Sequence, residues 1–264
     1  MDLLYRVKTL WAALRGNHYT WPAIDIFLPG NRHFHLVGSI HMGTRDMAPL
    51  PARLLKKLKR ADALIVEADV SGHDSPFASL PTFAALEDRI SEEQLRNLRK
   101  VVEELGISLS LFSTQPLWQI AMILQATQAQ QLGLRPEYGI DYQLLQAAKQ
   151  TQKPVIELEG AASQIALLCQ LPDNGLALLD DTLTHWHTNA RLLQVMIGWW
   201  LEQPPTSVSA SLPRTFSQPL YDVLMVKRNE AWRDALLALP PGRYVVAVGA
   251  LHLYGEGNLP QILK

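Results

Sequence analysis

The chain repeats one short pattern near its two ends, a β-rich run that leads into Gly-x-x-His. The first copy places Gly38 before His41, and the second places Gly249 before His252. A single copy is commonly no more than a strand end with a turn, but two copies constrain the fold. In open α/β sheets, ligands bind outside the carboxyl ends of the strands. If the two strands are neighbours, the repeat predicts a single site built from both halves of the chain.

Length and charge bound the class of protein. The 264 residues are enough to bury a large core. The 24 basic and 25 acidic residues give a net charge of -1, so the sequence predicts no nucleic-acid partner. The single cysteine, Cys169, excludes an internal disulfide and fits a reduced compartment. Because Cys169 stands in an apolar run, we expect it to pack on a buried helix face rather than act as a nucleophile.

The N-terminal segment carries apolar residues at helical spacing. These are Leu3, Leu4, Val7, Leu10, Trp11 and Leu14. Arg6 and Lys8 interrupt the apolar run, which argues against a signal peptide. We expect an amphipathic helix that packs on the domain, with peripheral membrane contact as the alternative. No apolar run is long enough to span a bilayer, and the sequence therefore predicts a cytoplasmic protein.

The remaining pattern predicts an α/β (α+β) fold with a mixed central sheet built from the N- and C-terminal halves. The predicted strands are residues 24–28, 33–37, 63–67, 153–157 and 244–248, and the first two form a hairpin closed by the turn-rich tripeptide Pro29-Gly30-Asn31. The predicted helices are residues 50–59, 91–106, 117–130, 141–150, 161–171, 177–202 and 218–239, with a closing turn at 259–263. A capping box at Ser91 and Gln94 opens the second of these helices, and Gly106 ends it. We expect a single domain over 1–264. Its helical middle, about residues 77–239, is expected to be an insertion that covers the site, and the loop 203–213 gives it room to move.

Several short motifs stand in a fixed order along the chain. They are Leu36-Val-Gly-Ser-Ile-His41-Met-Gly, Val66-Glu67-Ala-Asp69, Tyr138-Gly-Ile-Asp141, Lys153-Pro-Val-Ile-Glu-Leu-Glu159, Arg228-Asn229 and Val248-Gly-Ala-Leu-His252-Leu-Tyr-Gly255. In this order they resemble the TraB/PrgY/GumN family, which includes the TIKI metalloproteases, over about residues 30–264. The chain looks similar to the GumN-type bacterial branch. It departs mildly from the family pattern at Ser39 and Gly160, where threonine is frequent.

This resemblance implies a TIKI-like fold, related to that of erythromycin-esterase-like proteins. It also implies a divalent-metal-dependent hydrolase, with manganese or cobalt as the metal. The resemblance does not name the substrate, since the family also includes proteins described as pheromone-shutdown factors.

Two imidazoles and one carboxylate form the predicted metal site. Neutral imidazoles and carboxylates are good ligands for borderline divalent metals. His41 and His252 supply the imidazoles, and Glu67 supplies the carboxylate from the end of a strand that should neighbour the first. Three protein ligands leave room for water and substrate, and a metal lowers the pKa of its bound water. The alternative for Glu67 is a strand-end carboxylate that caps a helix or pairs with Arg45.

The resemblance places further residues near the site, and for each of them a structural role stays open. Arg228 either stabilises negative charge that develops on a substrate oxygen or forms a surface ion pair, with Glu230 nearby in the sequence. Asn229 follows it directly. Asp141 is either catalytic or the cap of the helix that begins there. Glu159 is likewise catalytic or structural.

The other polar residues near these motifs carry weaker signals. Asp69 would share the strand face of Glu67 and either orient a histidine or cap a loop. His18 and His73 have no partner pattern.

Four more histidines are expected to be structural. His185 and His187 stand two residues apart on a predicted helix, so their side chains diverge, with Trp186 on the core side. His33 and His35 share one strand face and are expected to make cross-strand contacts.

Three functions are consistent with these residues. The leading hypothesis is a metal-dependent hydrolase of peptide or related amide bonds, with His41, Glu67 and His252 at the metal. The second is a metal-independent esterase in which a histidine such as His41 acts as general base and Glu67 orients it. The third is a protein that binds a small peptide in the same cleft without turnover. The substrate, a small peptide or ester, is not specified further, and neither is the oligomeric state.

Overall fold

The computed structural model of the chain describes residues 19–69, 82–207 and 212–264. A five-stranded mixed sheet forms its base. The strands are β1 (Ala23–Leu28), β2 (Arg32–Ser39), β3 (Ala63–Val66), β4 (Val155–Glu157) and β5 (Gly242–Gly249), and their order in the sheet is β1-β2-β5-β3-β4. Strands β2, β5, β3 and β4 are parallel, and β1 is antiparallel to β2. The last strand of the chain therefore lies between two early strands, which confirms the predicted sheet built from both ends.

The hairpin of β1 and β2 turns at Gly30 and Asn31, as the sequence predicts. Both residues have positive φ, 79° and 57°. Leu28 pairs with Arg32, so residues 29–31 form a three-residue connection. Glycine and asparagine tolerate the positive φ that this connection requires better than other residues do.

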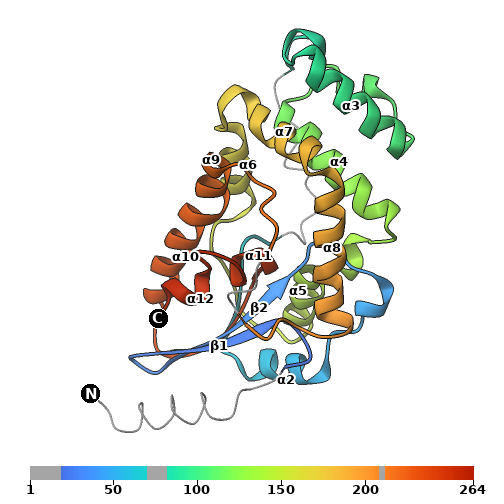
Figure 1. Ribbon diagram of the computed structural model, residues 1–264. Helices are drawn as coiled ribbons and strands as arrows, with labels where there is room; N and C mark the ends of the chain where they lie inside the picture. Colours follow the sequence, from blue (N-terminus) through green and yellow to red (C-terminus); the bar gives the residue numbers. More distant parts are fainter. Residues whose placement is uncertain (1–18, 70–81, 208–211) are drawn as a thin grey trace.

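Most helices lie above the sheet or on either side of it, and α2 lies below it (Figure 1). They are α2 (Ala52–Arg60), α3 (Glu92–Leu105), α4 (Leu117–Gln131), α5 (Ile140–Gln150), α6 (Ala161–Cys169), α7 (Leu176–Thr184), α8 (Trp186–Leu201), α9 (Gln218–Tyr221), α10 (Lys227–Leu237), α11 (Ala250–Leu253) and α12 (Leu259–Ile262). A π-helical turn, Asp222–Val226, joins α9 to α10.

Helix α3 begins and ends where the sequence places its signals. The Ser91 side chain accepts from the amide of Gln94, and the Gln94 side chain accepts from the amide of Ser91. This reciprocal capping box satisfies two amide groups that the first turn leaves unpaired. Gly106 closes the helix in the left-handed conformation, with φ 66°.

Each face of the sheet buries its own core. On one face, Leu54 of α2 and Leu144 of α5 pack with Val245 of β5. On the other face, Trp232 of α10 and Val246 of β5 pack together with residues of α11 and α12. Successive side chains of a strand point to opposite faces, so the continuous apolar run of β5 supplies both cores.

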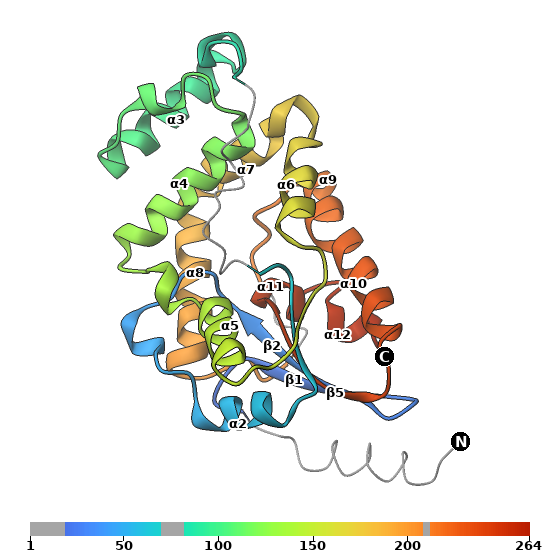
Figure 2. The same cartoon turned by 180° about the vertical axis from the view of Figure 1, so that it is seen from behind.

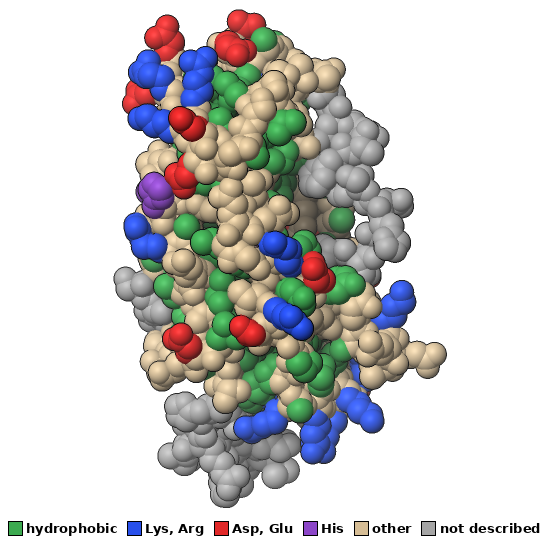
Figure 3. Space-filling view, turned by 90° about the vertical axis from the view of Figure 1, so that its right-hand side faces the viewer, with side chains coloured by type: hydrophobic (Ala, Val, Ile, Leu, Met, Phe, Trp, Pro, Cys, Tyr) green, Lys and Arg blue, Asp and Glu red, His purple; other side chains and the backbone are tan. Residues whose placement is uncertain are grey.

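A third core lies away from the sheet, between helices of the middle of the chain. Residues of α3, α4 and α7 form it, including Leu98, Trp118 and Leu179. Figure 2 shows these helices above the sheet, with α3 farthest from it. On the side view in Figure 3, acidic and basic side chains mix near the α3 end, and lysine and arginine gather at the sheet end.

Two sequence predictions about helices are wrong. The segment 177–202 is two helices, because the chain leaves helical geometry at His185 (φ -101°, ψ 20°) and the indole of the next residue, Trp186, is buried and donates to Glu104. Trp186 lies on the core side, as predicted. Cys169 is exposed, not buried, since α6 contributes no buried residue. The apolar periodicity correctly predicted helix α6, but it could not show whether other elements pack over the side of α6 that carries Cys169.

Some predictions fall outside the described residues. They are the N-terminal helix, the two histidines without a partner pattern, His18 and His73, and part of the loop 203–213. Among the residues that are described, no helix has both the length and the apolar character needed to cross a membrane.

Candidate functional site

The two Gly-x-x-His motifs end neighbouring parallel strands. In the register of β2 and β5, Gly38 pairs with Val248 and Ser39 pairs with Gly249, so the motifs are offset by one residue rather than equivalent. A Cβ on Gly38 would lie 3.3 Å from the Cα of Ala250, and glycine thus lets the first turn of α11 lie against β2. His41 follows β2 in an irregular segment, whereas α11 carries His252.

His252 is buried and held by the side chain of Asn229. Its Nδ1 lies 2.7 Å from Asn229 Oδ1, and Asn229 Nδ2 donates to the carbonyl of Gly257 at 3.0 Å. The second bond fixes the amide so that its oxygen faces the imidazole, and Nδ1 therefore carries the proton. Burial is the main reason why the pKa of His252 is lowered to about 3, and nearby Arg228 adds to it. His252 is neutral at physiological pH.

Arg228, whose role the sequence left open, is the centre of an ion cluster with Glu67, Glu159 and His252. We call this group the buried cluster. Its Nε and Nη2 donate to the two carboxylate oxygens of Glu159 at 2.8 and 3.1 Å, and Nη2 also donates to Glu67 at 2.6 Å. Its Nη1 donates to the carbonyl of Leu224 and faces Nε2 of His252, at 3.2 and 3.3 Å. The five N–H groups of the guanidinium thus have five acceptors within the protein. Arg228 is a partly buried partner of two acids, not a surface residue paired with Glu230.

Glu67 is a buried carboxylate whose two oxygens are both hydrogen-bonded. Oε1 accepts from the amide of Gly249 at 2.6 Å, and Oε2 accepts from Arg228 at 2.6 Å and from Gln164 at 3.3 Å. Burial alone would raise its pKa, but the positive charge of Arg228 and the Gly249 amide contribute to holding it at about 2. The alternative partner that the sequence suggested, Arg45, is not among these contacts.

His41 and Asp141 form a second polar pair where the candidate site meets solvent. We call this exposed end of the site, around the His41 side chain, the opening. Nδ1 of His41 lies 3.0 Å from Oδ2 of Asp141; the His41 side chain is 67% exposed and the Asp141 side chain 7%. Asp141 stands in the first turn of α5. Its negative charge is the main reason why the pKa of His41 is raised to about 9. Within the described residues, no hydrogen bond uses the Nε2 atom of His41, which is therefore available to a substrate.

The loop after β2 is fixed to the start of α5 by backbone contacts. The amide of Ile140 donates to the carbonyl of Ile40 at 2.9 Å, and Gly43 exchanges two bonds with Arg135 at 3.0 and 2.8 Å. A Cβ on Gly139 would lie 2.2 Å from the carbonyl oxygen of His41, so only glycine allows this approach. These contacts place His41 beside Asp141.

Several further contacts have partners that the sequence predictions did not name. Gln164, on α6, reaches Glu67, and no motif pointed to it. The buried carboxylate of Asp25 accepts from His33 and His35 at 3.2 and 2.8 Å, which explains the cross-strand role expected for these histidines. The amide of Asp69 donates to Glu157 at 2.8 Å, so the backbone of Asp69 ties β3 to β4.

The described residues do not fit a three-ligand metal centre in this arrangement. None of their histidine, cysteine, aspartate and glutamate side chains form a group of three or more that is spaced to hold a metal ion. Both oxygens of Glu67 accept hydrogen bonds, and the guanidinium of Arg228 stands between Glu67 and Nε2 of His252. A divalent cation in that place would have to displace a permanent positive charge.

Comparison with known proteins identifies relatives of the chain. It is 80% identical over 264 residues, the whole of both chains, to a protein named "Uncharacterized protein YbaP" in Escherichia coli strain K12. It is equally similar, over the same length, to a protein of that name in Shigella flexneri. No solved structure matches the chain significantly. The sequence profile of the TraB/PrgY/gumN family matches residues 25–264, and the chain belongs to this family.

Proposed function

We propose that this protein is a hydrolase of peptide or related amide bonds, with its reacting groups at the opening beside His41. The observation that carries the proposal is the pair of His41 and Asp141. The exposed imidazole of His41 is oriented through Nδ1 by the buried carboxylate of Asp141, which raises the pKa of His41. The pKa of the second imidazole, that of His252, is lowered instead. Titratable groups with pKa values pushed apart are typical of acid–base sites.

The chemistry follows from the free nitrogen of His41. In its neutral form, Nε2 accepts a proton from a water molecule as the water oxygen bonds to the substrate carbonyl carbon. The same nitrogen then returns that proton to the amide nitrogen as the C–N bond breaks, which yields a carboxylic acid and an amine. Asp141 holds the ring and stabilises the imidazolium between these steps.

The buried cluster has a positioning role in this proposal. Since the N–H groups of Arg228 are taken up by Glu67, Glu159, His252 and Leu224, the guanidinium acts through its charge and its fixed position rather than as a direct ligand of the substrate. It holds Glu67 ionised and His252 neutral beside the opening.

A metal-dependent hydrolase is the second candidate. The observation that favours it is that both imidazoles are held through Nδ1 by an oxygen acceptor, as metal-binding histidines commonly are. His41, Glu67 and His252 would be the ligands, and manganese and cobalt are the metals to try first. Because Arg228 would have to withdraw from Glu67 and His252, we derive no catalytic step through a metal.

One set of measurements separates these candidates. Purified protein is assayed for metal content and for turnover of a panel of peptide amides and esters, before and after chelation and with Mn²⁺ or Co²⁺ restored. The panel is repeated with His41→Ala and His252→Ala, and with His187→Ala as a control on an exposed histidine of α8. Activity that survives chelation but is lost in His41→Ala supports the first candidate.

Two other results have different meanings. Loss of both metal and activity in His41→Ala and His252→Ala, with normal behaviour of His187→Ala, supports the metal-dependent enzyme. Tight peptide binding without product under every metal condition would overturn hydrolysis and leave a peptide-binding protein.

A further inference from the structure

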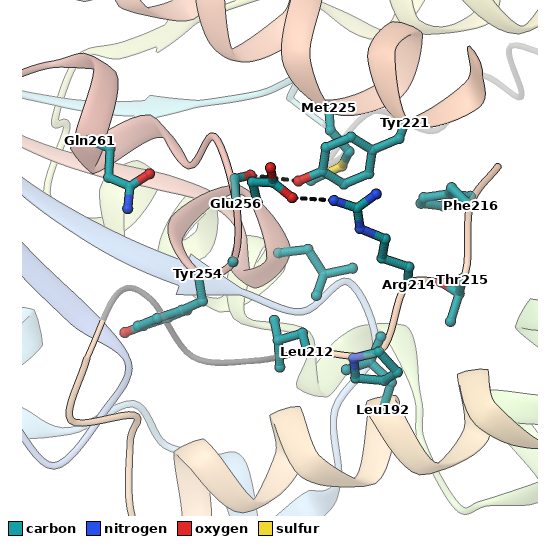
Figure 4. A pocket seen from close by; sticks show the side chains of 13 residues that line it. Leu192, Leu212, Arg214, Thr215, Phe216, Tyr221, Met225, Tyr254, Glu256 and Gln261 are labelled. Carbon is teal, nitrogen blue, oxygen red and sulfur yellow. Dashed lines mark hydrogen bonds and ion pairs between the residues drawn. The ribbon is translucent and has the colours of Figure 1, made fainter. Parts of the chain in front are cut away.

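A pocket of about 500 Å³ lies beside α11, next to the candidate site. Figure 4 shows its wall, which is largely aliphatic and aromatic and comes from separate segments of the chain. Leu192 lies on α8, Phe216 on the segment before α9, and Met225 on the π-helical turn, and Leu251 completes the apolar wall from α11. Its size fits one large side chain with part of the adjoining backbone.

The two charged side chains of this wall pair with each other. Arg214 forms an ion pair with Glu256, and the hydroxyl of Tyr221 donates to the carbonyl of Glu256 at 2.6 Å. The charged side chains that line the pocket are therefore a matched pair with no net charge. Such a wall favours an apolar occupant over a charged one, because a charged group would lose its hydration without a new partner.

Two residues of the wall connect the pocket to the candidate site. Leu251 directly precedes His252 in α11, and consecutive Cα atoms are about 3.8 Å apart. Met225 precedes Arg228 by three residues, about one helical turn. While the imidazole of His252 packs against Trp232 on α10, Leu251 lines the pocket. The pocket and the buried cluster thus share α11 and the stretch from the π-helical turn into α10, and this shared framework is the basis for assigning the pocket to the substrate.

We propose that this pocket binds a large apolar side chain, aromatic or branched aliphatic, of the residue adjacent to the bond that is cleaved. The inference rests on the proposed hydrolase function and adds its substrate class. It predicts that amides of phenylalanine and leucine are preferred over those of alanine, aspartate and lysine.

The test has a turnover arm and a binding arm. Turnover is measured with N-acetyl-phenylalanine and N-acetyl-alanine anilides, and the expected preference for phenylalanine is about tenfold or more in kcat/KM. Binding of N-acetyl-phenylalanine amide and N-acetyl-alanine amide is measured by calorimetry on the wild type and on His41→Ala, so that this arm needs no turnover.

Variants localise the preference to the pocket. Leu192→Trp fills the space and should abolish the preference for phenylalanine in both arms. Val195→Trp is the matched control, because Val195 lies on the same helix but is 47% exposed and does not line the pocket. Should Leu192→Trp fail to fold, Phe216→Ala enlarges the pocket and should weaken binding of the phenylalanine amide about tenfold.

The outcomes distinguish the subsite from the function. Turnover without a preference, or a preference unchanged in the pocket variants, overturns the subsite and leaves the hydrolase intact. A binding preference that Leu192→Trp removes, without turnover of any anilide, supports the subsite while the hydrolase proposal fails. No preference in either arm overturns the inference.

Discussion

Nδ1 of His41 lies 3.0 Å from Oδ2 of Asp141, although the two residues are 100 positions apart in the chain. His41 ends the first Gly-x-x-His motif, and Asp141 stands in the first turn of α5. The pair connects the sheet to the helical part of the chain at the opening of the candidate site. The effect of changing this pair on activity and on the pKa of His41 is the most direct test of acid–base chemistry at the candidate site.

Asp141→Asn should lower kcat/KM by about 100-fold or more, because an amide neither stabilises the imidazolium nor fixes the reactive tautomer. With Asp141 present, the pKa of His41 is raised to about 9, so the basic form and the activity increase as the pH rises towards 9. In the variant, this limb of the pH–rate profile should move to lower pH.

The measurement is a pH–rate profile together with an NMR titration of His41. Asp234→Asn is the control, since this exposed residue pairs only with its neighbour Arg233 among the ion pairs described. An unchanged limb in Asp141→Asn would show that His41 does not limit the rate.

Arg228→Met should lower the free energy of unfolding by about 3–5 kcal/mol, because it leaves the buried carboxylate of Glu67 and the partly buried carboxylate of Glu159 without their cation. Adding Glu67→Gln to this variant should recover part of the loss, since one uncompensated charge is removed. Urea denaturation measures the wild type and both variants, with Arg233→Met as a control in a more exposed ion pair. A loss below about 1 kcal/mol, the scale of an exposed ion pair, would mean that the cluster is solvated.

Asp25→Asn should destabilise the fold at neutral pH by about 2 kcal/mol, the scale of a lost charged hydrogen bond. Burial would raise the pKa of Asp25, but hydrogen bonds from His33, His35 and Tyr19 hold it well below its ordinary value. A depressed folded-state pKa contributes stability above the unfolded pKa of about 4, and this contribution is lost as the pH falls further.

The difference in unfolding free energy between the wild type and Asp25→Asn should therefore shrink below about pH 4. Denaturation at a series of pH values measures it, with the exposed Asp46→Asn as a control. A difference that stays constant down to pH 2 would contradict the assigned cause.

Gly139→Ala should reduce turnover more than stability, because the new Cβ would lie 2.2 Å from the carbonyl oxygen of His41 and must displace that loop. The control is Gly198→Ala within α8, where the nearest atom lies 4.0 Å away and a gain of about 1 kcal/mol is expected from helix propensity. Steady-state kinetics and thermal melting of both variants are compared. Equal kinetics in Gly139→Ala and the wild type would show that the position of His41 is not limiting.

Local signals in the sequence predicted much of the fold. The turn at Gly30 and the capping box at Ser91 depend on residues a few positions apart, and both appear where expected. The repeated motif correctly placed β2 beside β5, since two strands that end alike belong at one edge of a parallel sheet. The break at His185 could not be predicted, because the helical pattern continues through it and tertiary packing decides where the helix ends.

The contacts of the site were harder to predict. Arg228 has an acid two positions away in the chain, yet its partners Glu67 and Glu159 are 161 and 69 positions distant. Spacing along a helix cannot reveal such partners, and only the family resemblance placed these residues near one another. Gln164 carried no signal, since a lone glutamine on an apolar helix is indistinguishable from a surface residue.

The position of β5 in the sheet has a consequence for the order of folding. During synthesis, β2 and β3 emerge long before the strand that separates them, and neither can complete its hydrogen bonding until β5 arrives. Contacts between distant parts of a chain slow folding, because a long loop must close before they form. On the ribosome, the nascent sheet therefore has an open slot that the final strand fills. The amide of Gly249 reaches Glu67, and His252 reaches Arg228, only in that last event. Amide exchange should therefore show β5 and its neighbours protected together.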